Sequence, residues 1–158
     1  MKQLMLPAAF MRGGTSNAVV FRQEDLPPDQ ELWSEIFIAA MGSPDPYARQ
    51  LNGMGGGISS LSKVCVVGPP TREDADIDYT FAQIDVREAK VEYSGNCGNM
   101  SAAMGPFGVD EGYIKKDGDK AVVRIHNTNT AKIIEAHFDM DDGLAAIDGT
   151  YTLPGVGG

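Results

Sequence analysis

The sequence predicts an α+β fold in which a mixed, mostly antiparallel sheet wraps around a central helix. Three observations point to it. Short β-branched or alternating segments recur along the chain, one small apolar segment near residue 100 is typical of a buried helix, and neither a repeat nor an internal linker divides the 158 residues. This length suffices for one domain with a hydrophobic core, so we expect a single domain spanning 1–158.

The N-terminal part of the chain is expected to supply three strands and a helix. β-Branched runs and a glycine turn indicate the strands, while Trp33 and Phe37 recur at helical spacing between a capping Asp29 and a terminating Gly42. In chain order the expected elements are a strand, turn and strand within 4–22, a helix over 29–41, a Gly/Ser-rich loop over 52–63 and a strand over 63–68.

The C-terminal part adds strands before and after the buried helix. Ile77, Tyr79 and Phe81 alternate with polar residues, which predicts a half-buried strand. The helix follows Cys97, and Gly105-Pro106 should weaken or kink it. The remaining expected elements are a short strand within 89–96, two strands within 120–140 joined by the sequence NTNT, and a loop-like tail from 148.

Composition and charge argue against several classes of protein. The formal net charge is −9, which opposes binding to phosphate backbones or to an anionic membrane, so neither nucleic acid nor membrane is expected as a partner. No run of 18 apolar residues could span a bilayer, and a weak N-terminal likeness to a signal peptide is interrupted by Pro7. With two cysteines and two histidines at no metal-ligand spacing, we expect free thiols, no metal and a cytoplasmic location.

Three loops combine glycine with small polar residues: MRGGTSN at 11–17, NGMGGGISSLSK at 52–63 and SGNCGNMS at 94–101. Glycine lets a backbone approach a ligand closely, and the hydroxyls and amides beside it supply hydrogen-bond donors. Any one of these loops could be an ordinary turn. Their co-occurrence in one chain favours a shared binding site.

Lys63 ends the second loop and begins a strand. It could point to solvent, as most lysines at strand ends do. If it is partly buried, the loss of hydration favours its neutral amine, which is then a usable general base. Cys65, two residues further on, lies on the same face of the strand, and we expect it to be a core thiol.

Cys97 stands at the start of the expected buried helix, at its N-cap or in its first turn. The unpaired amides and the dipole of a helix N-terminus favour a thiolate. The amides of Gly98, Asn99 and Met100 could also hold a substrate carboxylate, or the charge that develops on it. The alternative is a small buried side chain, which most free cysteines are.

A serine acyl-transfer enzyme is a weaker alternative. Residues 60–63 match the S-x-x-K pattern of penicillin-recognising enzymes, and 94–96 loosely resemble their S-D-N box. However, the residues after Lys63 favour a strand instead of the helix that this chemistry needs, and no K-T-G follows. The glycine loop also lacks the signatures of a phosphate-binding loop.

Taken together, MRGGTS, GSPDPYARQLNGMGGGISSLSK and GNCGNMSAAMGPFG resemble the PrpF family, and the later NTNT stretch fits it as well. Its members include 2-methylaconitate isomerase, 4-oxalomesaconate tautomerase and methylitaconate isomerase. The resemblance implies a diaminopimelate-epimerase-like fold, in which two similar halves point the N-termini of their central helices at a shared site. It also implies an allylic 1,3-proton shift in a small unsaturated di- or tricarboxylate, without metal or organic cofactor.

The resemblance assigns roles to residues of this sequence. It makes Lys63 the acid/base residue and Cys97 a second residue of the site. The substrate carboxylates would be held by residues of the three loops, namely Arg12, Thr15, Ser16, Gly56, Gly57, Ser59, Ser60, Gly98, Asn99 and Met100. Arg12 could equally form a structural ion pair.

The sequence departs from the family in two places. Asn17-Ala18 stands where members usually have Lys-Gly after GGTS, and the chain stops at Gly158, so that the second half is absent. We therefore expect the N-terminal half of a two-domain protein and an incomplete isomerase. The alternative is a non-catalytic binding or assembly module, which could form a homo-oligomer through the surface left by the missing half.

Overall fold

Runs of β-branched and aromatic residues form the centre of one sheet. The computed structural model describes residues 3–157. In it, β2 (Ser16–Arg22) lies parallel to β3 (Lys63–Gly68), and β3 lies antiparallel to β4 (Ile77–Ile84). The glycine turn brings β1 (Ala9–Gly13) back against β2 as an antiparallel edge strand.

The second edge of the sheet comes from the C-terminal part of the chain. β6 (Lys120–Asn127) pairs in parallel with β4, and β7 (Lys132–Asp141) returns antiparallel to β6 and ends beside β8 (Leu144–Ala145). The short β5 (Val91–Glu92) pairs with the end of β4. Among the strand pairs of the described residues 3–157, only β2–β3 and β4–β6 are parallel, so the mixed, mostly antiparallel sheet is confirmed.

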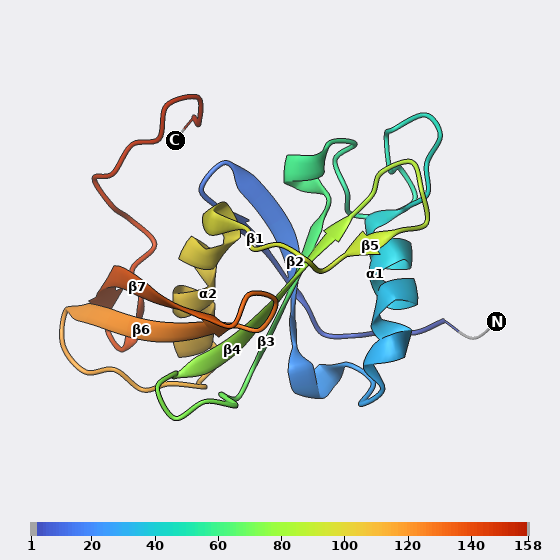
Figure 1. Cartoon of the computed structure of the whole chain (residues 1–158). Helices are drawn as coiled ribbons and strands as arrows, with labels where there is room; N and C mark the ends of the chain where they lie inside the picture. Colours follow the sequence, from blue (N-terminus) through green and yellow to red (C-terminus); the bar gives the residue numbers. More distant parts are fainter. Residues whose placement is uncertain (1–2, 158) are drawn as a thin grey trace.

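The sheet curls around α2 (Gly98–Asp110), which contacts strands from both of its edges (Figure 1). α2 is continuous through Pro106, whereas we expected Gly105-Pro106 to weaken or kink it. Packing outweighs the lost backbone hydrogen bond, because the helix is buried along most of its length. Gly105 lets α2 lie close to β7, since a Cβ there would stand 2.7 Å from the Cβ of Ala136.

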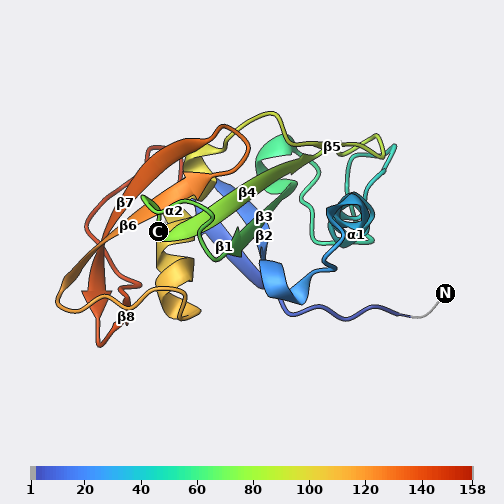
Figure 2. The same cartoon turned by 60° about the horizontal axis from the view of Figure 1, so that its bottom comes forward.

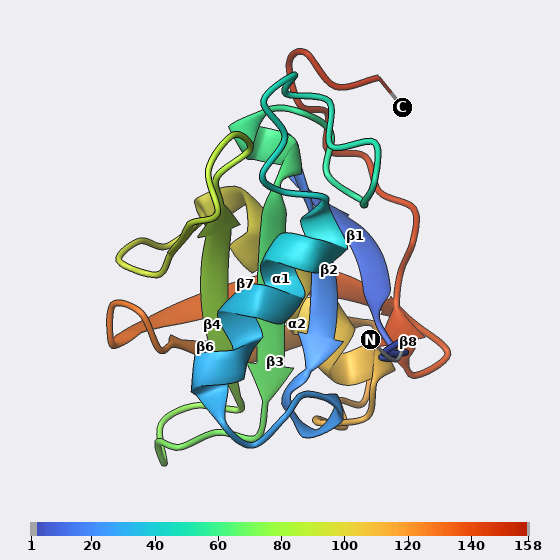
Figure 3. The same cartoon turned by 90° about the vertical axis from the view of Figure 1, so that its right-hand side faces the viewer.

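α1 (Trp33–Met41) packs on the opposite face of the sheet (Figure 2 and Figure 3). Phe37 stacks on Phe21 of β2 with ring centroids 5.8 Å apart. The carboxylate of Asp29 accepts a hydrogen bond from an amide of the short 3₁₀ turn that leads into α1. Gly42 ends the helix in the left-handed conformation, with φ of 77°. The stop at Gly42 is therefore confirmed, whereas Asp29 caps the 3₁₀ turn and α1 itself begins after Leu32 without a side-chain cap.

β4 is buried on both faces, and the prediction of a half-buried strand is wrong. Tyr79 and Phe81 face α2, as their alternation indicated. Ala82 and Ile84 belong to the second core, which α1 completes. The period-two pattern reports the more apolar face of a strand, and it does not reveal that a helix covers the other one.

The end of the chain has no regular secondary structure within the described residues. Beyond β8, residues 146–157 contain no helix or strand, which agrees with the predicted loop-like tail. None of the helices within residues 3–157 is long and apolar enough to cross a membrane.

Candidate active site at the start of the central helix

The turn between β1 and β2 rests directly on the first turn of α2. A Cβ at Gly13 would lie 2.4 Å from the carbonyl oxygen of Asn99, so only glycine permits this approach. The backbone amide of Thr15 donates to Asn99 Oδ1 at 3.4 Å, and Asn99 Nδ2 donates to Thr15 Oγ1 at 3.2 Å. Two of the three glycine-containing loops therefore meet, as the sequence suggested.

The N-terminus of α2 presents free donors. Cys97 is its N-cap, with extended backbone angles and no side-chain hydrogen bond to the helix. Within residues 3–157, no acceptor is bound by the amides of Gly98, Asn99 or Met100. Gly98 and Asn99 are exposed, so an incoming carboxylate can reach these amides.

Lys63 is buried at the start of β3 and does not point to solvent. Only 7% of the residue is exposed. Its Nζ donates to Gln83 Oε1 at 2.5 Å and lies 5.2 Å from the centre of the Phe81 ring. No carboxylate of residues 3–157 forms an ion pair with it. The lysine is thus held by a neutral amide and an aromatic face.

Two glutamines organise the second glycine-containing loop around Lys63. Gln83 Nε2 donates to the carbonyl oxygens of Ser59 and Ser62, at 3.0 and 2.9 Å. Gln50 is fully buried, donates to Ser62 Oγ at 2.8 Å and accepts from the amide of Gly57 at 2.9 Å. The loop is therefore anchored on both sides, and one of its anchors also binds the lysine.

Cys65 lies beneath the site, in the core between β3 and α2. Its sulfur is 3.8 Å from the hydroxyl of Tyr79, and burial raises the pKa of the thiol to about 12. The prediction of a core thiol is confirmed. The charges of Cys97 and Lys63 also act on this sulfur, the first raising and the second lowering its pKa. Lys63 precedes Cys65 by two residues on β3, and Cys97 packs against the hydrophobic core that contains Cys65.

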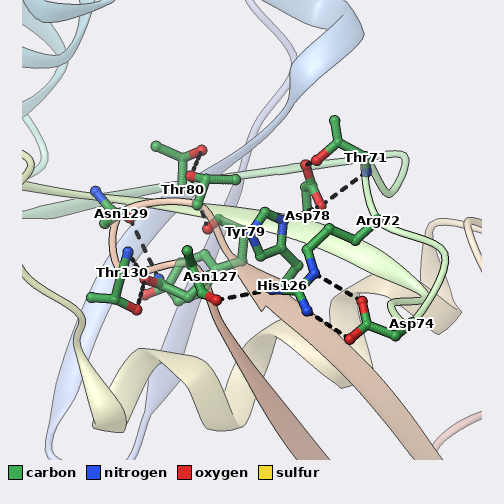
Figure 4. A network of polar contacts seen from close by, with 12 residues as sticks. Thr71, Arg72, Asp74, Asp78, Tyr79, Thr80, His126, Asn127, Asn129 and Thr130 are labelled. Carbon is green, nitrogen blue, oxygen red and sulfur yellow. Dashed lines mark hydrogen bonds and ion pairs between the residues drawn. The ribbon is translucent and has the colours of Figure 1, made fainter.

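Asn127 and Asn129 of the NTNT turn, which are labelled in Figure 4, form hydrogen bonds to the segment that precedes α2. The side-chain amide of Asn129 pairs with the backbone N–H and C=O of Phe81, at 2.8 and 2.9 Å, and so imitates another residue of the ladder. Asn127 Nδ2 donates to Asn96 Oδ1 at 3.2 Å, and this oxygen also accepts from Ser101 Oγ at 3.3 Å. These hydrogen bonds attach the residue that precedes Cys97 to the sheet.

A buried hydrogen-bonded pair of His126 and Asp78 lies on the other face of the sheet (Figure 4). His126 Nδ1 is 2.9 Å from Asp78 Oδ1, and Asp78 also accepts from the amide and hydroxyl of Thr71. Asp78 and His126 line a cavity of about 520 Å³ beside Trp33. Because Asp78 alternates with Tyr79 along β4, this pair lies away from Lys63 and α2.

The remaining predicted ligands are not drawn into the same network. Arg12 is exposed, stands opposite Asn17 in the β1–β2 ladder and alternates with Met11, which packs on the α2 core. Arg12 forms no ion pair within residues 3–157, so the alternative that it serves in a structural ion pair finds no support there. Ser16 is buried, whereas Gly56 donates to Leu61 within its own loop.

Sequence reasoning missed the polar residues that hold the site together. Gln50 and Gln83 were not singled out, and neither were Asn96 and the Asp78–His126 pair. One signal was available for Gln83: it continues the Ile77, Tyr79, Phe81 alternation as a polar residue on the apolar face. No group of three or more metal-ligating side chains occurs within residues 3–157.

Comparison with known sequences identifies several relatives. The family model described as PrpF protein matches residues 3–158. The chain is 44% identical over 156 residues to 3-methylitaconate isomerase of Eubacterium barkeri, covering 99% of this chain and 40% of the relative. It is 42% identical over 158 residues to 4-oxalomesaconate tautomerase of Pseudomonas putida, covering 100% and 43%. The chain therefore spans about two fifths of the length of these relatives.

Solved structures agree with the sequence matches. The crystal structure of a methylitaconate-delta-isomerase superimposes with a TM-score of 0.92 at 44% identity, over 97% of this chain and 39% of the other. A hydroxyproline epimerase from Agrobacterium vitis superimposes with a TM-score of 0.52 at 13% identity, over 87% and 39%. At such low identity the epimerase bears on the fold alone, and it confirms the epimerase-like half fold that the resemblance implied.

Proposed function

The chain belongs to the PrpF family, and on this premise we propose that it carries part of the catalytic site of a cofactor-independent isomerase. The reaction is an allylic 1,3-proton shift in a small unsaturated di- or tricarboxylate of the aconitate, methylaconitate or oxalomesaconate type. The names of the relatives support this substrate class. The observation that carries the proposal is the buried Lys63, which has a neutral hydrogen-bond partner and no carboxylate.

Lys63 serves as the general base. Its neutral amine removes a proton from the carbon next to a substrate carboxylate, and the electron pair left behind spreads over the double bond and the carboxylate. A proton then returns at the far carbon of the allylic system, so the double bond moves by one position and no atom is gained or lost. A lysine that is held by a neutral amide, with no carboxylate within ion-pair distance in residues 3–157, suits this role because no ion pair has to be broken for the amine to gain or lose a proton.

The first turn of α2 stabilises the intermediate charge. The amides of Gly98, Asn99 and Met100 have no acceptor within residues 3–157 and lie at the positive end of the helix dipole. Thr15 lies beside these amides, because its hydroxyl oxygen accepts a hydrogen bond from the side chain of Asn99. We assign the substrate carboxylate to these donors and Cys97 to the second proton-transfer position. We assign Gly56, Gly57, Ser59 and Ser60 to the lysine side of the site, because they belong to the loop that leads into Lys63.

We also propose that the chain corresponds to the N-terminal half of a two-domain protein. The relatives support this, because the chain spans about two fifths of their length. In that arrangement a second half closes the site opposite α2. We propose that this two-domain protein is cytoplasmic, that it acts on polycarboxylates and that it binds neither nucleic acid nor membranes.

Proton exchange in D₂O tests the proposed reaction. The protein is incubated with trans-aconitate or a methylaconitate, and deuterium uptake into the substrate is followed by NMR. Lys63→Ala should lower the exchange rate by about 100-fold or more, since a positioned acid/base group contributes about 10²–10⁴-fold. Lys120→Ala, at an exposed position of β6, is the matched control and should exchange at the wild-type rate. Full exchange by Lys63→Ala would show that the assigned base is wrong.

A second candidate is a non-catalytic binding or assembly module, which the short span relative to the family favours. Such a module would associate through the surface that a second half would otherwise cover, and a homodimer could rebuild a two-sided site. Analytical ultracentrifugation distinguishes the cases. A monomer at all accessible concentrations that exchanges substrate protons supports the isomerase and contradicts the module.

A further inference from the structure

The geometry points to Gln83 as a positioning residue that holds the amine of Lys63 without committing it to the charged form. This inference rests on the proposed function, because it concerns the proposed base. It starts from the sheet register: Lys63 and Gln83 are directly opposite each other in the antiparallel β3–β4 ladder. Directly opposed side chains on one face of a sheet lie within contact distance.

The orientation of the Gln83 amide is determined by what surrounds it. Its nitrogen faces two carbonyl oxygens, of Ser59 and Ser62, and only an NH₂ group can donate to both. The amide oxygen must therefore be the atom that faces Lys63 Nζ. Amide flips are ambiguous where the partners are themselves ambiguous, but two backbone carbonyls are acceptors only.

A neutral acceptor suits a lysine that has to gain and lose a proton. Both an ammonium and a neutral amine can donate to the oxygen of Gln83, so the hydrogen bond persists through the catalytic cycle. A carboxylate at the same place would form an ion pair and favour the ammonium strongly. The amide thus keeps the amine in place and leaves its charge state free to change.

Few other groups lie around Lys63. The ring of Phe81 lies beneath it on β4, and Cys65 follows it on β3. No carboxylate is within ion-pair distance of Lys63 in residues 3–157. A charge introduced at position 83 would therefore dominate the protonation of Lys63.

Two variants at position 83 and one control test this role. Gln83→Glu adds a negative charge beside Nζ, and Gln83→Leu removes the acceptor. Gln50→Leu is the control, because Gln50 anchors the same loop through Ser62 and Gly57 but has no hydrogen bond to Lys63. The titration of Lys63 is followed by the ¹³Cε and ¹⁵Nζ NMR signals of the 158-residue protein, with Lys63→Arg used to assign them.

The titration midpoint of Lys63 should move up by about one pH unit or more in Gln83→Glu, because an opposite charge within about 4–6 Å shifts a titration by about one to three units. It should move down in Gln83→Leu, because the ammonium then loses the hydrogen-bond acceptor that stabilises it. Gln50→Leu should leave it in place. In the D₂O exchange assay, the acid limb of the pH–rate profile should move in parallel. At its own pH optimum Gln83→Leu should lose about tenfold to 100-fold in kcat with little change in KM.

Unchanged midpoints in both Gln83 variants would overturn the inference. So would a shift in Gln50→Leu as large as that in Gln83→Leu, because Gln83 would then act only by holding the loop. The two proposals fail in different ways. If the wild-type protein does not exchange substrate protons but the midpoints move as described, the proposed function is wrong and the positioning of Lys63 by Gln83 stands.

Discussion

Lys63 and Cys65 show how strongly the environment of a residue decides its chemistry. They lie two residues apart on the same face of β3, and both are buried. Cys65 has the hydroxyl of Tyr79 as its neighbour, whereas Lys63 has the amide of Gln83 and the ring of Phe81. The thiol belongs to the core, while the amine is held at the start of β3 by a neutral hydrogen-bond acceptor, which suits the base role that we propose for it.

The two cysteines should differ sharply in reactivity. Cys97 is partly exposed at the helix start, whereas Cys65 is fully buried and burial raises its pKa to about 12, so almost no thiolate is present at neutral pH. Brief treatment of the native protein with iodoacetamide at pH 7.5 should label Cys97 only, as read by peptide mass spectrometry. Labelling in urea should modify both. Modification of Cys65 in the native protein would show that β3 opens more easily than its burial indicates.

Two elements far apart in sequence meet at a single point, where the β1–β2 turn touches the first turn of α2. The contact depends on Gly13, whose missing side chain leaves room for the carbonyl of Asn99. The Thr15–Asn99 hydrogen bonds then set the register of the turn against the helix. The position of the free amides at the start of α2 therefore depends on the β1–β2 turn as well as on the helix.

Gly13→Ala should separate the turn from α2. The new Cβ would stand 2.4 Å from a backbone oxygen that cannot move without moving the helix, so we expect a loss of about 2 to 3 kcal/mol in the free energy of unfolding. Gly95→Ala is the control, because nothing lies within 4 Å of its Cβ position. Urea unfolding compares the two. Equal stability of both variants would mean that the turn and the helix adjust independently.

The whole molecule has two hydrophobic cores that share strands β2, β3 and β4. α2 fills the curl of the sheet and α1 covers its back, which buries the central strands on both faces (Figure 2). The protonation of the groups inside this double layer is therefore linked to folding. Burial raises the pKa of Cys65 to about 12 from an ordinary 9.0, and burial likewise raises the pKa of Tyr79.

Alkaline pH should destabilise the fold. In the unfolded chain Cys65 loses its proton near pH 9.0, whereas the folded protein keeps it until about pH 12. The folded state binds more protons in this window, so stability is complete below pH 9 and falls as the pH rises, by about 1.4 kcal/mol per unit for each such group.

Urea unfolding between pH 8 and 11 measures this slope. Cys65→Ala should show a shallower decline than the wild type whatever its starting stability. A Cys65→Ala variant with the wild-type slope would assign the alkaline loss to other groups.

The sequence by itself determined the order of the elements, the buried helix after Cys97, and the loops that hold Lys63 and Cys97. These follow from local signals, since periodicity, caps and glycine turns act over a few residues. Only the tertiary structure decided that Lys63 is buried, that Gln83 faces it and that β4 is covered on both sides. Lys63 and Gln83 are 20 residues apart, and their contact exists because the register of β3 and β4 places them opposite each other. A register depends on how whole strands pack, and no short window of sequence contains that information.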